Sequence, residues 1–342
     1  MKLRNLISYL ETIAPLAYQE SYDNSGLIVG DENMDITGVM CCLDSTEAVV
    51  EEAIKKGCNV VVAHHPIVFR GIKSLTGKNY VERVVLKAIK KEVALYAIHT
   101  NLDNVYHQGV NAKIAERLKL KHTAILDPKS VHQKLTIYAP AAQSNAVKAY
   151  FEDLPKLLKK SISSLAVQNQ NQASLKMEVH FPSFQQQQIL NIIQNIQKEI
   201  SLTYEINKIS KINGQVGSGM IGELEKSISE KKFLAYLKEN MQVDVVKHTQ
   251  LLDKKIKRVA VCGGAGGFLL PAAIRKKADI FITSDYKYHE FFDADKKIII
   301  ADIGHYESEQ FTIELLQSII SEKFANFAIF STTIDTNPVF YY

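Results

Sequence analysis

The sequence predicts an α/β domain that is interrupted by a smaller α+β domain. Short apolar runs typical of buried strands alternate with amphipathic helices over residues 1–130 and again over residues 214–342. Residues 131–213 instead follow the order βαββαβ, which is that of a ferredoxin-like unit. We therefore expect a discontinuous α/β domain made of residues 1–130 and 214–342, with residues 131–213 inserted as a ferredoxin-like domain.

The composition sets limits on the class of protein. The 342 residues are 46% hydrophobic and 23% charged, as in ordinary globular chains. No apolar run reaches the ~18–20 residues of a membrane span, and the N-terminus lacks a signal peptide pattern, so we expect a cytoplasmic protein with no membrane partner. Four cysteines without CxxC spacing favour reduced thiols in the core. The net charge of +4 falls within residues 134–213 and is too weak to indicate nucleic acid, since solvated helix faces account for it.

The first 130 residues show a β-α-β order, which implies parallel strands with helices on the faces of the sheet. Leu6, Ile7 and Leu10 lie at helical spacing in the first element, and Gly57 is a typical residue for the end of the second helix. The turn at 21–26 is equally consistent with a simple tight turn and with the rim of a site. The predicted elements are helices over 5–16, 46–57, 79–91 and 109–118, and strands over 26–30, 36–43, 60–63 and 93–102.

Two adjacent histidines follow a strand rich in β-branched residues. His64 and His65 come directly after Val60–Ala63 and before Pro66, which cannot continue a central strand. The ends of strands in an α/β sheet are the usual place for a site, and both imidazoles can approach one cavity where the chain turns. The alternative is two unrelated histidines, one buried and one exposed.

Asp103 lies just beyond the next buried strand, as the histidines do beyond theirs. Two neighbouring strands that both end in ligand-type residues are a better indication of a site than either strand alone. Asp103 is also consistent with a turn or helix-capping residue before the helix at 109–118.

The middle of the chain carries no cluster of histidines and carboxylates. Its glutamines are typical of a solvated helix face. Residues 217–222 match G-x-G-x-x-G, but no helix opens at the last glycine, so we interpret them as a flexible return from the inserted domain. The predicted elements are strands over 134–140, 162–167, 175–181 and 202–209, and helices over 144–159 and 185–198.

The last third resumes the α/β pattern. The glycines at 263–267 stand between a strand and a helix, where they would either present N–H groups to an anion or allow close packing in a tight turn. The predicted elements are helices over 229–240 and 268–277, and strands over 243–246, 256–262, 279–283 and 298–302.

A third group of ligand-type residues follows the last of these strands. His305 and Glu309 are four residues apart, which places them on one helix face, about 5–6 Å apart at Cβ. Together with His64, His65 and Asp103 they give three imidazoles and two carboxylates. This set suits two divalent ions ~3.5–4 Å apart, with coordination positions left for water. Two such ions can activate water for hydrolysis, so the set indicates a hydrolase. Mixed N/O ligation fits Zn, Fe, Mn or Ni and does not choose among them.

Several ordered motifs give the chain a strong resemblance to the Nif-three-like family (NGG-one-interacting factor three), also known as GTP cyclohydrolase I type 2 homologues. The motifs are SYDNSGLIVG, VVAHHPIVF, AIHTNLDN, GGAGG, ADIFITSDYKYHEFFDA and ADIGHYESE. The resemblance covers nearly the whole length. It implies a toroidal homohexamer with dinuclear sites facing its cavity and His64, His65, Asp103, His305 and Glu309 as metal ligands.

The resemblance also bears on two further residues and on the insertion. Asp285 and His289 match the family's T-G-D-x-x-x-H stretch, with Ser284 where glycine is usual, and we take both as candidate catalytic residues. For His289 the alternatives are a structural histidine, a sixth ligand, or an acid–base group that shuttles a proton. The middle domain resembles the PII-like, CutA-like insertion of longer members, although it lacks their His-Pro-Tyr-Glu motif.

Three functions are consistent with these features. The first is a metal-dependent hydrolase acting on a small molecule such as a nucleotide or a cyclic amidine. The second is a regulatory or scaffold toroid whose metals are structural and whose insertion binds a small molecule or partner. The third, a DNA-binding ring, is disfavoured by the neutral charge of the α/β domain.

Overall fold

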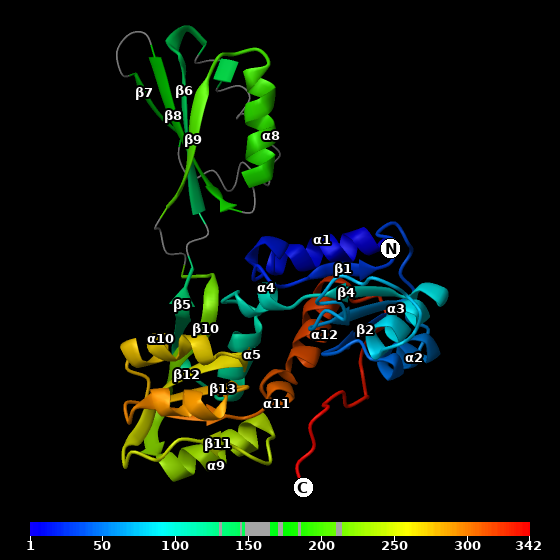
Figure 1. Cartoon of the computed structure of the whole chain (residues 1–342), viewed down its shortest axis with the longest axis vertical. Coiled ribbons are helices and arrows are strands. Elements are labelled where there is room, and N and C mark those ends of the chain that lie inside the picture. Colours follow the sequence, from blue (N-terminus) through cyan, green and yellow to red (C-terminus); the bar gives the residue numbers. More distant parts are fainter. Residues whose placement is uncertain (130–131, 144–145, 148–164, 170–173, 184–185, 210–213) are drawn as a thin grey trace. The chain divides into compact units, whose positions relative to one another are not determined.

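The computed structural model describes every residue except 130–131, 144–145, 148–164, 170–173, 184–185 and 210–213. The chain divides into two compact units. Unit 1 comprises Met1–Pro128 and Gly214–Tyr342, and unit 2 comprises Lys129–Asn213 (Figure 1). The chain as a whole is a mixed α/β protein.

The first sheet of unit 1 has five strands in the order β1-β4-β3-β2-β15. Strands β2, β3, β4 and β15 are parallel, as the β-α-β order predicts, and β1 is antiparallel to β4. The bounds are β1 Gly26–Val29, β2 Val39–Cys42, β3 Val60–Ala63, β4 Ala94–Ala97 and β15 Ile329–Ser331.

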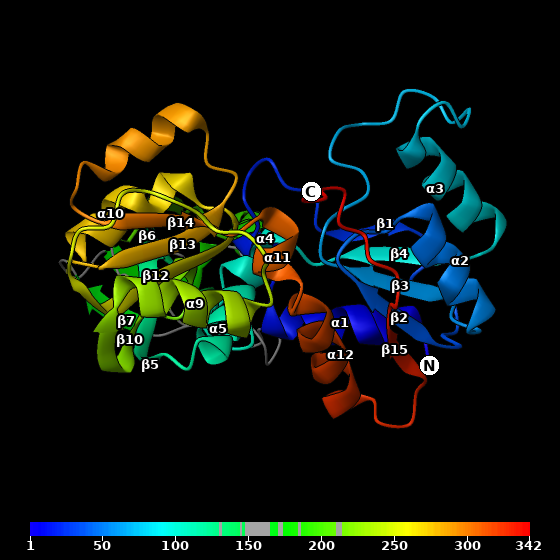
Figure 2. The same cartoon turned by 90° about the horizontal axis from the view of Figure 1, so that it is seen from below.

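Helices cover both faces of this sheet (Figure 2). Alternate residues of β2 and β3 enter different apolar clusters, because successive side chains in a strand point to opposite faces. Met40 and Val61 pack with α2 (Glu47–Lys55) and α3 (Tyr80–Lys90). Residues on the other face pack with α1 (Leu3–Ile13) and α12 (Thr312–Lys323).

The second sheet of unit 1 has six strands in the order β11-β14-β13-β12-β10-β5, of which β12, β13 and β14 are parallel. Its strands are β5 Lys121–Pro128, β10 Gly217–Ser229, β11 Lys247–His248, β12 Lys255–Ala265, β13 Ile280–Ser284 and β14 Ile299–Asp302. The other described helical segments of unit 1 are η1 Leu16–Tyr18, α4 Thr100–Asp103, α5 Val110–Arg117, α9 Glu230–Met241, η4 Gly267–Leu269, α10 Leu270–Arg275, η5 Tyr288–Ala294 and α11 His305–Glu309.

Two sequence interpretations in this sheet are wrong. The glycines of residues 217–222 are not a flexible return but the start of β10, which pairs with β5 and β12. A Cβ at Gly217 would lie 2.3 Å from the Asp127 carbonyl oxygen, so glycine permits close strand pairing there. The strand expected at 243–246 lies instead at β11, because Lys247 and His248 are the residues that pair with β14.

Unit 2 contains a four-stranded antiparallel sheet in the order β7-β8-β6-β9. Its apolar core includes Leu135, Ile137 and Val179 from the sheet and Ile189 and Ile193 from the helix α8. The helix expected over 144–159 lies outside the described residues. The bounds are β6 His132–Pro140, η2 Ala141–Gln143, β7 Leu165–Asn169, β8 Ser174–Pro182, α8 Gln186–Gln197 and β9 Thr203–Lys208.

Two general expectations can be compared with the structure. All four cysteines are buried, as their apolar surroundings predict. Among the described residues, the structure contains no helix with both the length and the apolar character that a membrane span requires.

Candidate metal centre

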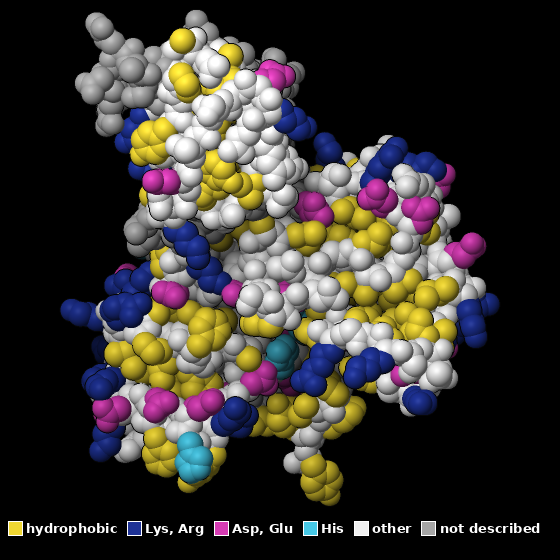
Figure 3. Space-filling view, turned by 45° about the horizontal axis from the view of Figure 1, so that its top comes forward, with side chains coloured by type: hydrophobic (Ala, Val, Ile, Leu, Met, Phe, Trp, Pro, Cys, Tyr) yellow, Lys and Arg dark blue, Asp and Glu magenta, His cyan; other side chains and the backbone are white. Residues whose placement is uncertain are grey.

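The structure brings the five ligand-type residues together between the two sheets of unit 1. His64 and His65 follow β3, Asp103 ends the short helix α4 just beyond β4, and His305 and Glu309 lie on α11 just beyond β14. Their ligand atoms form groups within 4.8 Å of one another. Histidine and acidic side chains meet on this face of unit 1 in Figure 3.

The first group consists of His64, Asp103 and Glu309. His64 Nε2 lies 3.6 Å from Asp103 Oδ1 and 3.7 Å from Glu309 Oε1. These distances are too long for hydrogen bonds, and His64 Nε2 and Asp103 Oδ1 are both buried without a hydrogen-bond partner among the described residues. Two atoms that each lie about 2.0–2.2 Å from one ion are separated by about 3–3.8 Å, depending on the angle between them. The group therefore fits a metal ion.

The second group consists of His65, His305 and Glu309. Glu309 Oε2 lies 3.0 Å from His65 Nε2 and 3.2 Å from His305 Nε2. The two imidazole Nε2 atoms are 3.3 Å apart. Glu309 thus directs one carboxylate oxygen toward each group.

The outer ring nitrogen of each histidine is held by a hydrogen-bond acceptor. Nδ1 lies 2.9 Å from the Ile98 carbonyl oxygen in His64, 2.9 Å from Asp44 Oδ1 in His65, and 2.6 Å from Asp285 Oδ2 in His305. Donation of the Nδ1 proton to these oxygens leaves the Nε2 lone pair free to face the centre, as in most histidine metal ligands. Asp285 therefore orients His305.

His99 is a further histidine at the centre that the sequence reasoning did not single out. It forms a third ligand-type group with His64 and His65, and its Nδ1 lies 2.8 Å from Asp23 Oδ1. His99 stands two residues after β4, a position that could have drawn attention to it. Asp23 belongs to the turn at 21–26, so the structure favours the interpretation of that turn as the rim of a site.

The glycines at 263–267 serve close packing. The N–H groups of Gly263, Gly264 and Gly266 donate to side-chain oxygens of the protein, at 2.9–3.0 Å. They are thus not directed at an anion. A Cβ at Gly264, where φ is +64°, would lie 2.6 Å from Glu309 Oε1. Glycine at this position leaves room for the shared carboxylate.

Burial and charge act together on the two carboxylates. Burial, reinforced by the neighbouring Glu309 carboxylate, raises the pKa of Asp103. Burial opposes the ionisation of Glu309 as well, but His64 and the hydrogen bonds from the imidazoles lower its pKa well below the usual range. Two carboxylates buried side by side favour a bound cation.

The imidazoles of the second group respond to the same carboxylates. Burial alone would lower the pKa of His65, but hydrogen bonds with Asp44 and Glu309 raise it to about 10. Burial likewise opposes the charge on His305, and its hydrogen bonds raise its pKa to about 11. A divalent ion binds only the neutral imidazole, so metal binding at these two histidines would compete with the Nε2 proton.

A cavity of about 580 Å³ opens onto the centre. This size is within the range of small-molecule sites. Lys247 lines this cavity, and its Nζ lies 2.6 Å from Asp302 Oδ2. The aromatic residues around the cavity are Tyr22, Phe69, Tyr80, Phe268, Tyr306 and Tyr341.

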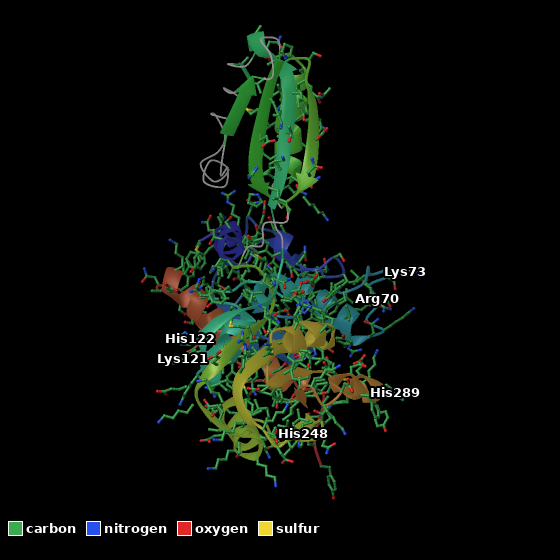
Figure 4. All side chains as sticks on the ribbon, turned by 90° about the vertical axis from the view of Figure 1, so that its left-hand side faces the viewer. Arg70, Lys73, Lys121, His122, His248 and His289 are labelled. Atoms are coloured by element: carbon green, nitrogen blue, oxygen red, sulfur yellow. The ribbon has the colours of Figure 1, made fainter. Side chains whose placement is uncertain are left out.

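His289 lies apart from this centre. It is exposed in η5, its ring contacts that of Tyr288, and it does not line the cavity. Figure 4 shows it at the outer surface of unit 1. The structure thus brings Asp285 to the centre through His305 and does not bring His289 there, and a role for His289 stays a prediction.

The fold and the clustered ligand-type residues define an α/β protein with a candidate metal centre. A family model for Duf34/NIF3 (NGG1p interacting factor 3) matches residues 1–338. The chain belongs to this family, as its motifs indicated.

Curated relatives and solved structures agree with this assignment. The chain is 29% identical to a GTP cyclohydrolase 1 type 2 homolog of Staphylococcus aureus strain MSSA476, with 100% of both chains covered. It is also 29% identical to the homolog of Bacillus subtilis strain 168, with 98% of this chain and 97% of that one covered. The crystal structure of Staphylococcus aureus protein SA1388 matches with a TM-score of 0.82 at 29% identity, over 100% of this chain and 99% of that chain.

Proposed function

We propose that the chain is a metal-dependent hydrolase with a dinuclear centre. The observation that carries this proposal is the position of Glu309, whose two carboxylate oxygens face two separate groups of ligand-type atoms. A carboxylate shared in this way supports two adjacent divalent ions, about 3.5–4 Å apart.

In this proposal each ion has its own protein ligands. His64, Asp103 and Glu309 Oε1 would hold the first ion, and His65, His305 and Glu309 Oε2 would hold the second. We call these the first and second metal positions. The imidazole and carboxylate donors suit Zn, Fe, Mn or Ni.

The ions and the side chains would divide the chemistry between them. Two divalent ions would polarise a carbonyl, amidine or phosphoryl group and acidify water near neutral pH. Asp44, Asp285 and the Ile98 carbonyl oxygen orient the histidines, so that their geometry is set before substrate arrives. The aromatic side chains around the cavity would bind a small planar substrate. The names of the curated relatives support a nucleotide or cyclic amidine.

The test is a metal count followed by an activity screen. After the metal-free protein is reconstituted with divalent metal, we expect about two ions per chain. Inductively coupled plasma mass spectrometry measures this metal content. The loaded protein is then screened against nucleotides, phosphoesters and cyclic amides. His64→Ala or Glu309→Ala should lower both metal content and turnover without unfolding the chain.

His122→Asn provides a matched control. His122 is exposed in β5 with φ of 51°, and asparagine tolerates this backbone conformation. This variant should keep its metals and turnover. Full metal occupancy in a His64→Ala/His305→Ala double variant would contradict the assignment of the ligands. Full occupancy without turnover on any substrate would favour a regulatory or scaffold role.

The second candidate function, a regulatory or scaffold protein, draws support from unit 2. Numbered by their order in the sequence, its strands follow one another across the sheet as 2-3-1-4, which is the antiparallel order of a ferredoxin-like unit, and none of the candidate ligands lies in it. We infer that unit 2 is a ferredoxin-like, PII-like insertion that binds a small molecule or partner. We also propose the toroidal homohexamer that the family resemblance implies, which light scattering of the purified protein would test.

A further inference from the structure

The end of the chain lines the cavity of the candidate metal centre. Residues 332–342, here called the C-terminal segment, follow β15 in the first sheet and contain no helix or strand. Figure 2 shows this segment in red, passing from β15 toward α11. Asn337, Pro338, Val339 and Tyr341 belong to the wall of the cavity. The segment therefore lies within reach of residues that orient the ligands.

One chain of hydrogen bonds leads from this segment to the second metal position. Thr336 Oγ1 donates to Asp44 Oδ2 at 2.7 Å. The other oxygen of the same carboxylate, Oδ1, lies 2.9 Å from His65 Nδ1, and His65 Nε2 lies 3.0 Å from Glu309 Oε2. Because Thr336 holds one oxygen of Asp44, it fixes the carboxylate orientation that in turn fixes the His65 ring.

A second link joins the segment to α11, which carries His305 and Glu309. Asn337 Nδ2 donates to Glu307 Oε1 at 3.1 Å, and Tyr341 also hydrogen-bonds Glu307. Glu307 is only 8% exposed and lies midway between the two ligand residues. These contacts hold the short helix in place.

The first metal position is supported differently. His64 is oriented by the Ile98 carbonyl oxygen and Asp103 lies on α4. Within the part of the chain that the structure describes, no hydrogen bond joins His64 or Asp103 to the C-terminal segment. Loss of the Thr336 hydroxyl should therefore act on the second metal position and spare the first.

We infer that Thr336 and Asn337 are positioning residues for the second metal position, so that the C-terminal segment determines whether the centre holds one ion or two. The inference rests on the proposed dinuclear centre. Loss of a partner that orients a ligand lowers metal affinity by about 10–100-fold. We expect this loss for the second ion alone.

Titration of the metal-free full-length protein with Mn²⁺ tests the inference. Thr336→Val removes the hydroxyl at nearly constant volume, and Thr336→Ser keeps it as the matched control. Calorimetry gives the two affinities, and electron paramagnetic resonance distinguishes a spin-coupled pair from a single ion. We expect the wild type and Thr336→Ser to bind two ions and show the coupled signal. Thr336→Val should keep the first affinity, lose about 10–100-fold in the second and show a single-ion signal at stoichiometric Mn²⁺.

A truncated chain that ends at Ile334 gives an independent arm. It keeps Thr332 and Thr333, whose hydroxyls donate to Glu52, and thus the attachment of the segment to α2. It should lose at least as much affinity at the second metal position as Thr336→Val does, because it also lacks the contacts of Asn337 and Tyr341 with Glu307. Unchanged second-site affinity in both variants overturns the inference, and so does an equal loss at both positions. If the wild type itself binds fewer than two ions, the proposed dinuclear centre fails and the inference fails with it.

Discussion

Gly264→Ala should weaken metal binding even though Gly264 carries no ligand atom. The added Cβ would lie 2.6 Å from Glu309 Oε1, which is 0.8 Å short of the 3.4 Å at which ordinary contact begins. It would also lie 3.4 Å from His305 Nε2. A functional site tolerates displacements of only about 0.5 Å. The shared carboxylate would have to move by more than that, and Oε1 belongs to the first metal position.

Two costs follow from this substitution. The displaced carboxylate should lower the affinity of the first metal position by at least about 10–100-fold, by analogy with the loss of an orienting partner. The positive φ of +64° should also cost about 1–2 kcal/mol of folding stability, because alanine disfavours the left-handed region. The affinity is measured by Zn²⁺ competition against a chromophoric chelator, and the stability by chemical denaturation of the metal-free protein.

Gly267→Ala is the matched control in the same glycine-rich stretch. Its added Cβ would meet the Tyr286 ring at 3.7 Å, which is ordinary contact, so both affinities should stay at the wild-type values. Wild-type affinity for both ions in Gly264→Ala would refute the argument that this glycine makes room for a metal-bridging carboxylate.

The remaining predictions concern three other parts of the chain. His289→Ala should keep both ions, because the His289 ring lies outside the cavity. Loss of one ion per chain would show that His289 is a ligand. A ~10²–10⁴-fold fall in turnover with both ions kept would support an acid–base role. Replacing unit 2 by a short linker from Lys129 to Gly214 should leave a folded chain that still binds its metals, because Pro128 and Gly217 are paired neighbours in β5 and β10. Loss of metal from a folded deletion variant would show that unit 2 helps to build the centre. Burial opposes the ionisation of Glu52, but hydrogen bonds from Lys56, Thr332 and Thr333 lower its pKa to about 2. Glu52→Gln should therefore cost about 2 kcal/mol at pH 7, a difference that disappears as the pH falls from about 4.5 to 2; a difference constant with pH in denaturant titrations would contradict this origin.

The positions of the candidate ligands could be predicted because each one stands at a boundary that is visible in the sequence. His64 and His65 follow a run of β-branched residues and precede a proline, and the i, i+4 spacing of His305 and Glu309 follows another buried strand. Parallel strands then carry such residues to one edge of a sheet. Pattern and geometry together are enough to place this part of the site.

The partners of the ligands could not be predicted because tertiary contacts alone select them. In the sequence Asp44 lies between a predicted strand and a predicted helix with nothing to mark a role at the site, whereas in the folded chain it holds His65. Thr336 reaches Asp44 across 292 positions of the sequence, and no local pattern encodes that contact. The role of the glycines of residues 217–222 could not be predicted either, because close strand pairing and a flexible loop both favour glycine.

Anomalous diffraction from crystals grown with Mn²⁺ would test the shared carboxylate most directly. We predict two peaks per chain, about 3.5–4 Å apart. One should be bound by His64, Asp103 and Glu309, and the other by His65, His305 and Glu309. A single peak, or two peaks of which only one is in contact with Glu309, would contradict a dinuclear centre bridged by this residue.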